Sequence, residues 1–165
     1  MSSQSADLRT TQEPLKQRYR DDPESARLTL HATSDLDDGV SCRVQTAQAM
    51  VTAGLHPYTG GDGTLACSGD MLLEALAACA GVTMRAVATS MGISVSGQLH
   101  VEGDLDFRGT LGVSKDAPVG FTAIRVRTDI ETDASDEQRA TLLRLTERYC
   151  VVLQTIRSAP SVTVG

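Results

Sequence analysis

A chain of 165 residues is long enough for one domain with a short extension, because a single hydrophobic core grows comfortably at this size. Apolar residues make up 41% of the chain and aromatic residues only 3%, so the core must be built from small aliphatic side chains. The formal charge of −6 provides no basic surface, which argues against a nucleic-acid partner and against attraction to anionic membranes.

The N-terminal residues 1–25 are polar and charged and contain two prolines, a composition typical of an arm outside the folded part. We therefore expect an arm at 1–25 and one folded domain at 26–165. The N-terminus lacks the apolar stretch and small-residue cleavage site of a secretory signal. The expected location is cytoplasmic, where cysteines are mostly reduced thiols.

The domain is predicted to begin with a meander of antiparallel strands. Apolar and polar residues alternate over 26–33, a turn is predicted at 34–39, and further strands are predicted at 40–46 and 47–55. The segment 56–63 holds three glycines and is interpreted as a loop. It lacks the lysine of a phosphate-binding loop, so we interpret it as a mobile mouth beside the helix that follows.

A long helix is predicted from Ser68 to about Met91. Ser68 can cap it, Asp70 suits the positive end of the helix dipole, and Gly92 fits its termination. Residues 75–84 are apolar or small on every face, which predicts a central, enclosed helix. The apolar stretch 71–84 has only fourteen residues, fewer than the roughly 20 needed to cross a bilayer, so no membrane contact is expected.

The second half of the chain is predicted to hold two long strands, a helix and a last strand. Alternation indicates strands at 93–113 and 121–132 on either side of a turn at 114–120. Ser135 and Gln138 have the spacing of a capping box, which predicts a helix through Tyr149, followed by one or two more helical turns after Cys150 and a strand at 161–165. This order of elements predicts an α+β domain.

The four cysteines, at 42, 67, 79 and 150, are the residues with the most chemical potential. A free cysteine usually behaves as a small buried hydrophobe, so an inert core role is the default for each of them. They form no C-x-x-C pair and the three histidines are scattered, so no metal site is predicted. A chemical role requires a lowered thiol pKa and access for an oxidant.

Two segments resemble the OsmC/Ohr family, which contains the osmotically inducible and organic hydroperoxide resistance proteins. SGDMLLEALAACAGVTM (68–84) resembles the family's central helix with its reactive cysteine, and YCVVLQTIRSAPSVTV (149–164) resembles its C-x-V-x-x-T-[LI] segment with the partner cysteine and final strand. The resemblance implies an OsmC-like fold, with antiparallel sheet packed around a central buried helix, in an intertwined homodimer.

The resemblance also implies an antioxidant, stress-response activity: thiol-dependent reduction of organic hydroperoxides. Cys79 would attack the peroxide as a thiolate and become a sulfenic acid, and Cys150 would condense with it to a disulfide that a cellular thiol reduces. No metal or flavin cofactor is implied.

The supporting residues of the family are not all present. The family's glutamate lies ten residues before the reactive cysteine, where this chain has Gly69, and Asp70 is the nearest substitute. Glu74 lies about 140° around the helix from Cys79, which favours a packing or salt-bridge role. Where the family's arginine is expected, the loop holds His56, which can carry a proton near neutral pH but more often has no such role.

These departures leave alternatives open. The chain is also consistent with an OsmC-like fold that binds a small apolar ligand or a partner without turnover, or with a redox-sensing or structural disulfide protein. Cys67, just before the helix, competes with Cys150 as the resolving cysteine, whereas Cys42 is expected in the core with Arg43 facing away from it. Val151 replaces a proline that often follows the partner cysteine.

Overall fold

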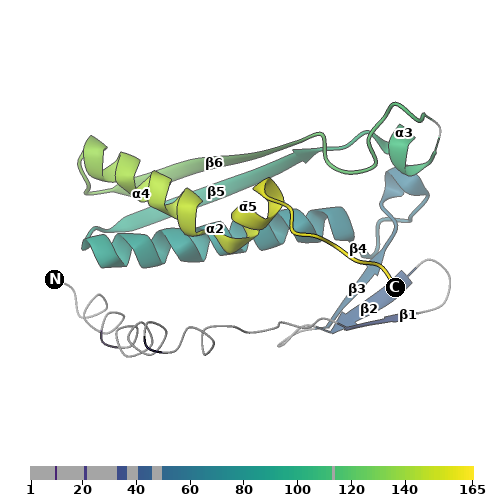
Figure 1. Ribbon diagram of the computed structural model, residues 1–165, viewed down its shortest axis with the longest axis horizontal. Coiled ribbons are helices and arrows are strands. Elements are labelled where there is room, and N and C mark those ends of the chain that lie inside the picture. The colour runs from purple at the N-terminus through teal and green to yellow at the C-terminus, as the bar shows by residue number, and fades with distance from the viewer. Residues whose placement is uncertain (1–9, 11–20, 22–32, 37–40, 46–49, 113) are drawn as a thin grey trace. The chain divides into compact units, whose positions relative to one another are not determined.

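The computed structural model describes residues 33–36, 41–45, 50–112 and 114–165, together with residues 10 and 21, and it describes the side chains of all of these except 33–36 and 41–45 (Figure 1). Apart from residues 10 and 21, the predicted arm at 1–25 and the predicted strand up to residue 32 lie outside this part of the chain. The boundary between arm and domain therefore stays a prediction.

Four strands form the first sheet, in the order β1 (Thr33–Leu36), β2 (Ser41–Gln45), β3 (Met50–Gly54) and β4 (Ala66–Cys67). The first three are antiparallel neighbours, which confirms the predicted pairing of the strands at 40–46 and 47–55, and β4 pairs with β3 in parallel. The turn predicted at 34–39 is wrong for residues 34–36, which pair with Val44, Arg43 and Cys42. Backbone pairing with β2 outweighs the turn preference of a serine and an aspartate there. A short 3₁₀ turn (Pro57–Thr59) lies inside the predicted loop 56–63.

Helix α2 (Ser68–Met91) has the predicted bounds, with Asp70 in its first turn and Gly92 following at φ 70°. One face is buried, through Leu76, Ala80, Met84, Val87 and Ala88. The expectation of enclosure on every face is wrong for the single chain, because Val82 is 72% exposed.

Helix α2 is longer than the fourteen-residue apolar stretch within it. The helix has 24 residues, so by length and composition alone it is long and apolar enough to cross a membrane. The core helix of a soluble protein meets the same criterion, and α2 contributes the buried face just described to a protein core.

Strands β5 (Val95–Asp104) and β6 (Ala123–Thr132) form a second, two-stranded sheet. They run antiparallel, since Thr132 bonds to Ser94 at one end and Thr122 bonds to Asp104 at the other. The strand predicted to reach residue 113 ends at Asp104, because the Asp106 side chain accepts a hydrogen bond from the backbone N–H of Arg108 and so caps a short helix, α3 (Phe107–Thr110).

The C-terminal part holds α4 (Asp136–Tyr149) and α5 (Val151–Arg157). Both hydrogen bonds of the predicted capping box are present between Ser135 and Gln138. The strand predicted at 161–165 is wrong: this segment has no regular structure, and Val164 is 94% exposed. Its alternating valines have the pattern of a strand, but they pair with no strand among the described residues.

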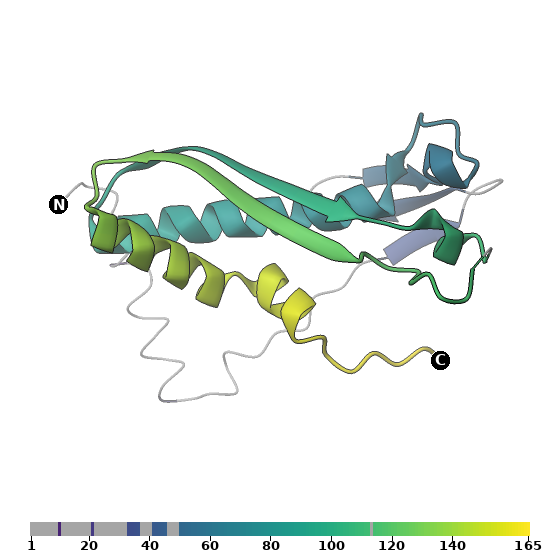
Figure 2. The same ribbon diagram turned by 90° about the horizontal axis from the view of Figure 1, so that it is seen from above.

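The described residues fall into two compact units, the first with residues 76–100 and 127–165 and the second with 33–75 and 101–126. In the first unit, α4 runs beside the C-terminal part of α2 in both views (Figures 1 and 2). Its core combines side chains from α2, β5, β6 and α4, namely Met84, Val87, Ala88, Val95, Ile130 and Leu142. The mixture of helices with antiparallel sheet around a central helix confirms the predicted α+β class.

Candidate thiol site

Two cysteines from distant parts of the sequence meet in the first unit. Cys79 lies in the middle of α2, and Cys150 lies at the junction of α4 and α5. Their side chains are hydrogen-bond partners. Cys79 is half-buried and Cys150 is fully buried, so only the Cys79 sulfur is open to a reactant.

The junction between α4 and α5 is a one-residue break at Cys150. The backbone of Cys150 is extended, with φ −72° and ψ 105°, and its N–H still closes the last turn of α4 on the Thr146 carbonyl. The first amides of α5 therefore have no intrahelical acceptor. Two of them, those of Val151 and Val152, donate to the Cys79 sulfur.

These donors lower the pKa of the Cys79 thiol below its ordinary value. Partial burial alone would raise this pKa, but hydrogen bonds from the Val152 amide, the Cys150 thiol, the Val151 amide and the Thr83 hydroxyl together outweigh that effect. Each donor stabilises the charged sulfur more than the neutral one. Backbone and side-chain dipoles thus perform the role for which the sequence suggested a cation.

The pKa of Cys150 moves in the opposite direction. Burial raises it most, and the hydrogen bond to the Cys79 sulfur and the charge on that sulfur raise it further, against the opposing effect of the Leu153 and Val152 amides. Cys79 is therefore the thiol of the pair that ionises first, and the Cys150 thiol donates the hydrogen bond between them.

Helix α5 is fixed to the end of α4 by two interactions with Glu147. The Gln154 side-chain amide donates to the Glu147 carbonyl oxygen over 2.8 Å, and the Arg157 guanidinium forms an ion pair with the Glu147 carboxylate. Both interactions are exposed, so their value lies in orientation more than in stability. They hold the first amides of α5 in the direction of Cys79.

Two of the predicted supporting residues, His56 and Asp70, lie in the second unit. There they line a cavity of about 180 Å³ with Cys67, and Phe107 and Phe121 also line it. His56 stacks on Phe107 with ring centroids 5.1 Å apart, and its Nδ1 accepts a hydrogen bond from the Tyr58 amide. Within the second unit, the structure therefore brings His56, Asp70 and Cys67 together around one cavity.

The remaining predicted residues take no part in the thiol pair. Glu74 is exposed and has no ion-pair partner among the residues whose side chains are described, so the predicted salt bridge is not formed there. The side chains of Cys42 and Arg43 lie outside the described part. Within that part, no group of three or more histidine, cysteine, aspartate or glutamate residues is placed to hold a metal ion.

The geometry predicts that Cys79 ionises below the ordinary thiol value of about 8.5. The rate at which iodoacetamide alkylates Cys79 should therefore rise with pH and reach its plateau at a lower pH than the rate of a free thiol. Replacement of Cys150 by alanine removes a hydrogen-bond donor to the Cys79 sulfur and should move the pH midpoint of alkylation upward. Cys150→Ser keeps a donor at this position and should move the midpoint less. Mass spectrometry of the peptide containing Cys79 gives the rate, and a midpoint at or above 8.5 in the parent protein would contradict the assignment.

Comparisons with known proteins agree on one family. The family profile described as OsmC-like protein matches residues 61–165, well over half of the chain. No curated protein sequence matches the chain.

Several solved structures share the fold. An OsmC-like protein from Mycoplasma pneumoniae superimposes with a TM-score of 0.67 at 18% identity, over 80% of this chain and 89% of that one. An OsmC-like protein of unknown function from Vibrio cholerae gives 0.64 at 11% identity, over 78% and 94% of the two chains. The organic hydroperoxide resistance protein OhrB of Bacillus subtilis gives 0.51 at 18% identity, over 80% and 93%. With the family profile and the fold in agreement, the chain belongs to the OsmC-like protein family.

Proposed function

We propose that this protein is a thiol-dependent peroxidase that reduces organic hydroperoxides, with Cys79 as the attacking thiolate and Cys150 as the resolving cysteine. The observation that carries the proposal is the hydrogen-bonded pair with opposite pKa shifts: a half-buried thiol whose pKa is lowered beside a fully buried thiol whose pKa is raised. A nucleophile needs a lowered pKa and access, and Cys79 has both.

The reaction is proposed in three steps. The Cys79 thiolate attacks the terminal peroxide oxygen, the O–O bond breaks, and the departing alkoxide takes a proton to leave as an alcohol. The Cys79 sulfenic acid then condenses with the Cys150 thiol, which forms the S–S bond and releases water. Two equivalents of an external thiol reduce this disulfide and are oxidised to a disulfide themselves.

The surroundings of Cys79 favour an organic peroxide. Val82, one turn further along α2, is 72% exposed, and Val151, whose amide contacts the Cys79 sulfur, is 71% exposed. Exposed apolar side chains beside a half-buried nucleophile offer contact area to an alkyl group, which hydrogen peroxide lacks. The name of the Bacillus subtilis protein with the same fold, organic hydroperoxide resistance protein, is in keeping with this substrate class.

We also propose that the chain acts as a homodimer. The exposed side of α2 carries Leu72 and Val82, and a large apolar side chain on a central helix is normally covered. Sedimentation of the full chain tests this: a dimer is expected, and a monomer at micromolar concentration would refute it.

The proposed function is tested by mixing the reduced protein with cumene hydroperoxide in a stopped-flow instrument. Peroxide should disappear in the first turnover, and the intact mass should then fall by two hydrogens through a bond that peptide mapping assigns to Cys79 and Cys150. Hydrogen peroxide at equal concentration is the matched control and should react about tenfold more slowly or worse, the effect expected from one lost apolar group. Failure of cumene hydroperoxide to oxidise the pair would overturn the proposal.

A further inference from the structure

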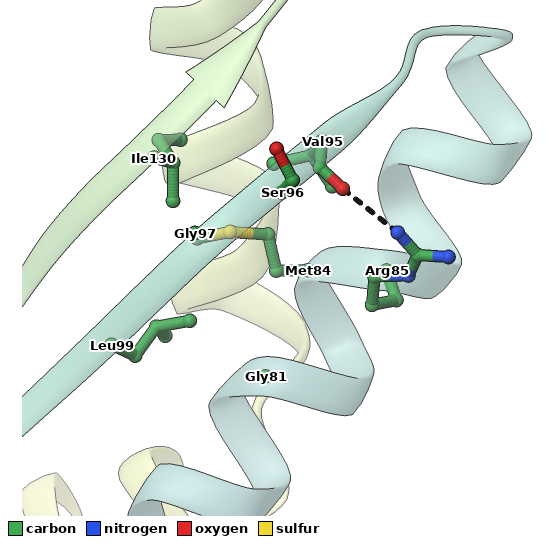
Figure 3. Close-up of a pocket in the computed structure, with 8 residues that line it drawn as sticks. All are labelled: Gly81, Met84, Arg85, Val95, Ser96, Gly97, Leu99 and Ile130. Atoms are coloured by element: carbon green, nitrogen blue, oxygen red, sulfur yellow. Dashed lines mark hydrogen bonds between the residues drawn. The ribbon is translucent and has the colours of Figure 1, made fainter.

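Thr146 places a polar group in the interior of the first unit. It is 6% exposed and is the only buried polar residue among the residues whose side chains are described. Leu142, one turn before it on α4, belongs to the apolar core of the unit. Figure 3 shows three further members of that core, Met84 from α2, Val95 from β5 and Ile130 from β6. A hydroxyl beside such a core needs a hydrogen-bond partner.

The Thr146 hydroxyl has no such partner. Its Oγ1 forms no hydrogen bond with any group in the described part of the chain, including the backbone carbonyl one turn earlier that a helical threonine commonly uses. A buried hydroxyl without a partner lowers the stability of the fold, and a valine of the same shape would avoid that cost. The orphan hydroxyl therefore indicates a partner that becomes available in another state of the site.

Cys150 is placed to be that partner. Its backbone N–H donates to the Thr146 carbonyl oxygen over 3.0 Å, which closes the last turn of α4 and puts the two residues on the same side. Side chains four residues apart on a helix are neighbours, with Cβ atoms about 5–6 Å apart. Cys150 is 0% exposed, so both side chains lie in the interior. A helical threonine has two accessible χ1 rotamers, so its hydroxyl can turn to the Cys150 sulfur.

We propose that the Thr146 hydroxyl donates a hydrogen bond to the Cys150 sulfur when Cys150 attacks the Cys79 sulfenic acid. The inference rests on the roles proposed above for these two cysteines. In this step the S–S bond forms, the S–O bond of the sulfenic acid breaks, and the proton of the Cys150 thiol leaves with the hydroxyl as water. Negative charge develops on a fully buried sulfur, where it is costly without donors. The Leu153 and Val152 amides donate from α5, and Thr146 supplies a donor from α4.

The resting pair does not need this donor. There the Cys150 thiol keeps its proton and donates it to the Cys79 sulfur, so no charge on Cys150 attracts the Thr146 hydroxyl. The attack on the peroxide removes the charge from Cys79, and Cys150 becomes the sulfur that ionises. The Thr146 hydroxyl therefore acts in the second step of the reaction and not in the attack on the peroxide.

The test compares two substitutions in the full-length protein. Thr146→Val removes the hydroxyl and keeps the shape of the side chain, whereas Thr146→Ser keeps the hydroxyl. With cumene hydroperoxide, Thr146→Val should consume peroxide at the parental rate but form the disulfide about tenfold more slowly, the effect of one lost hydrogen bond to a charged group. Thr146→Ser should form the disulfide at close to the parental rate. Rapid quenching with dimedone, followed by mass spectrometry, measures the sulfenic acid and the disulfide separately.

A merely structural role of Thr146 predicts a different result. Loss of an unpaired buried hydroxyl should leave Thr146→Val at least as stable as the parent in urea denaturation. The pH at which disulfide formation reaches half its maximal rate should nevertheless rise, because the Cys150 thiolate has lost a donor. Thr141→Val changes a threonine on another side of α4 and is the matched control, which should alter neither the rate nor this pH.

A second oxidant separates this inference from the proposed peroxidase activity. The Cys79 thiolate attacks dithiodipyridine, which releases one thiopyridone and leaves a mixed disulfide, and Cys150 then attacks that disulfide and releases the second. In protein with Cys42 and Cys67 replaced by serine, the second release should be about tenfold slower in Thr146→Val. Failure of cumene hydroperoxide alone would refute the peroxidase and leave this second step to be measured. Equal second-step rates in Thr146→Val and the parent, or no second release from the parent, would overturn the role of Thr146.

Discussion

Replacement of Cys79 by serine is expected to reduce the rate of organic hydroperoxide reduction by at least about 10³-fold, because the reaction loses its nucleophile. A serine hydroxyl does not ionise near neutral pH, so the amides of Val151 and Val152 would contact a neutral oxygen there. The fold should persist, since serine is close to cysteine in size and Cys79 is only half-buried. The peroxide remaining after a fixed time, measured beside the circular dichroism spectrum, separates lost chemistry from lost structure.

The same assay distinguishes the two cysteines of the pair. Cys150→Ser should still consume one equivalent of peroxide, but the Cys79 sulfenic acid then persists and can be trapped with dimedone, because no thiol stands beside it. Cys67→Ser is the matched control, since Cys67 lines the cavity with His56 in the second unit, and it should form the disulfide at the parental rate. If Cys67→Ser formed no disulfide while Cys150→Ser still formed one, Cys67 would be the resolving cysteine.

The elements predicted correctly from the sequence are those with local signals at their ends. Helix α2 begins at a serine with Asp70 in its first turn and ends before a glycine at positive φ. Helix α4 begins with a capping box whose two hydrogen bonds join residues three apart. Such signals act within a few residues, so they do not depend on the rest of the fold.

The strand predictions were less accurate because a strand is defined by its neighbour. Residues 34–36 have the composition of a turn but pair with β2, and Val162 and Val164 alternate like a strand but pair with none of the described strands. Apolar alternation shows which face of a strand is suited to burial. It does not show where pairing stops, and so β5 ends at Asp104, earlier than its pattern predicted.

The thiol site was predictable in part. The identity of Cys79 and Cys150 as a pair came from the resemblance of two segments, because 71 residues separate them and no spacing rule brings them together. The sequence suggested a charged side chain as the source of the lowered Cys79 pKa, but the donors are mainly backbone amides. Those amides are free only because α4 and α5 break at Cys150, and no proline or glycine marks that break.

Replacement of Leu142 by alanine is expected to lower the free energy of unfolding by about 3 to 5 kcal/mol, the range typical of a leucine removed from a core that does not collapse around the space. Leu142 is 0% exposed and is the α4 residue in the core that joins α4 to α2 and to the β5–β6 sheet. A loss of this size is a large part of the 5–15 kcal/mol that stabilises a typical domain. Urea denaturation measures it, with the parent and the variant at the same protein concentration so that association contributes under the same conditions to both.

Leu111→Ala is the matched control, because Leu111 is 55% exposed at the end of α3 and its truncation should change the free energy of unfolding by no more than about 0.5 kcal/mol.

The effect of Leu142→Ala should also reach the thiol pair. Leu142, Thr146 and Cys150 are spaced four residues apart and so lie on one side of α4 and its end. The cavity left by Leu142→Ala loosens the junction of α4 and α5, where the Val151 and Val152 amides donate to the Cys79 sulfur. The pH midpoint of Cys79 alkylation should therefore rise in Leu142→Ala and stay unchanged in Leu111→Ala. Equal denaturation midpoints for the two variants would contradict the packing described for α4.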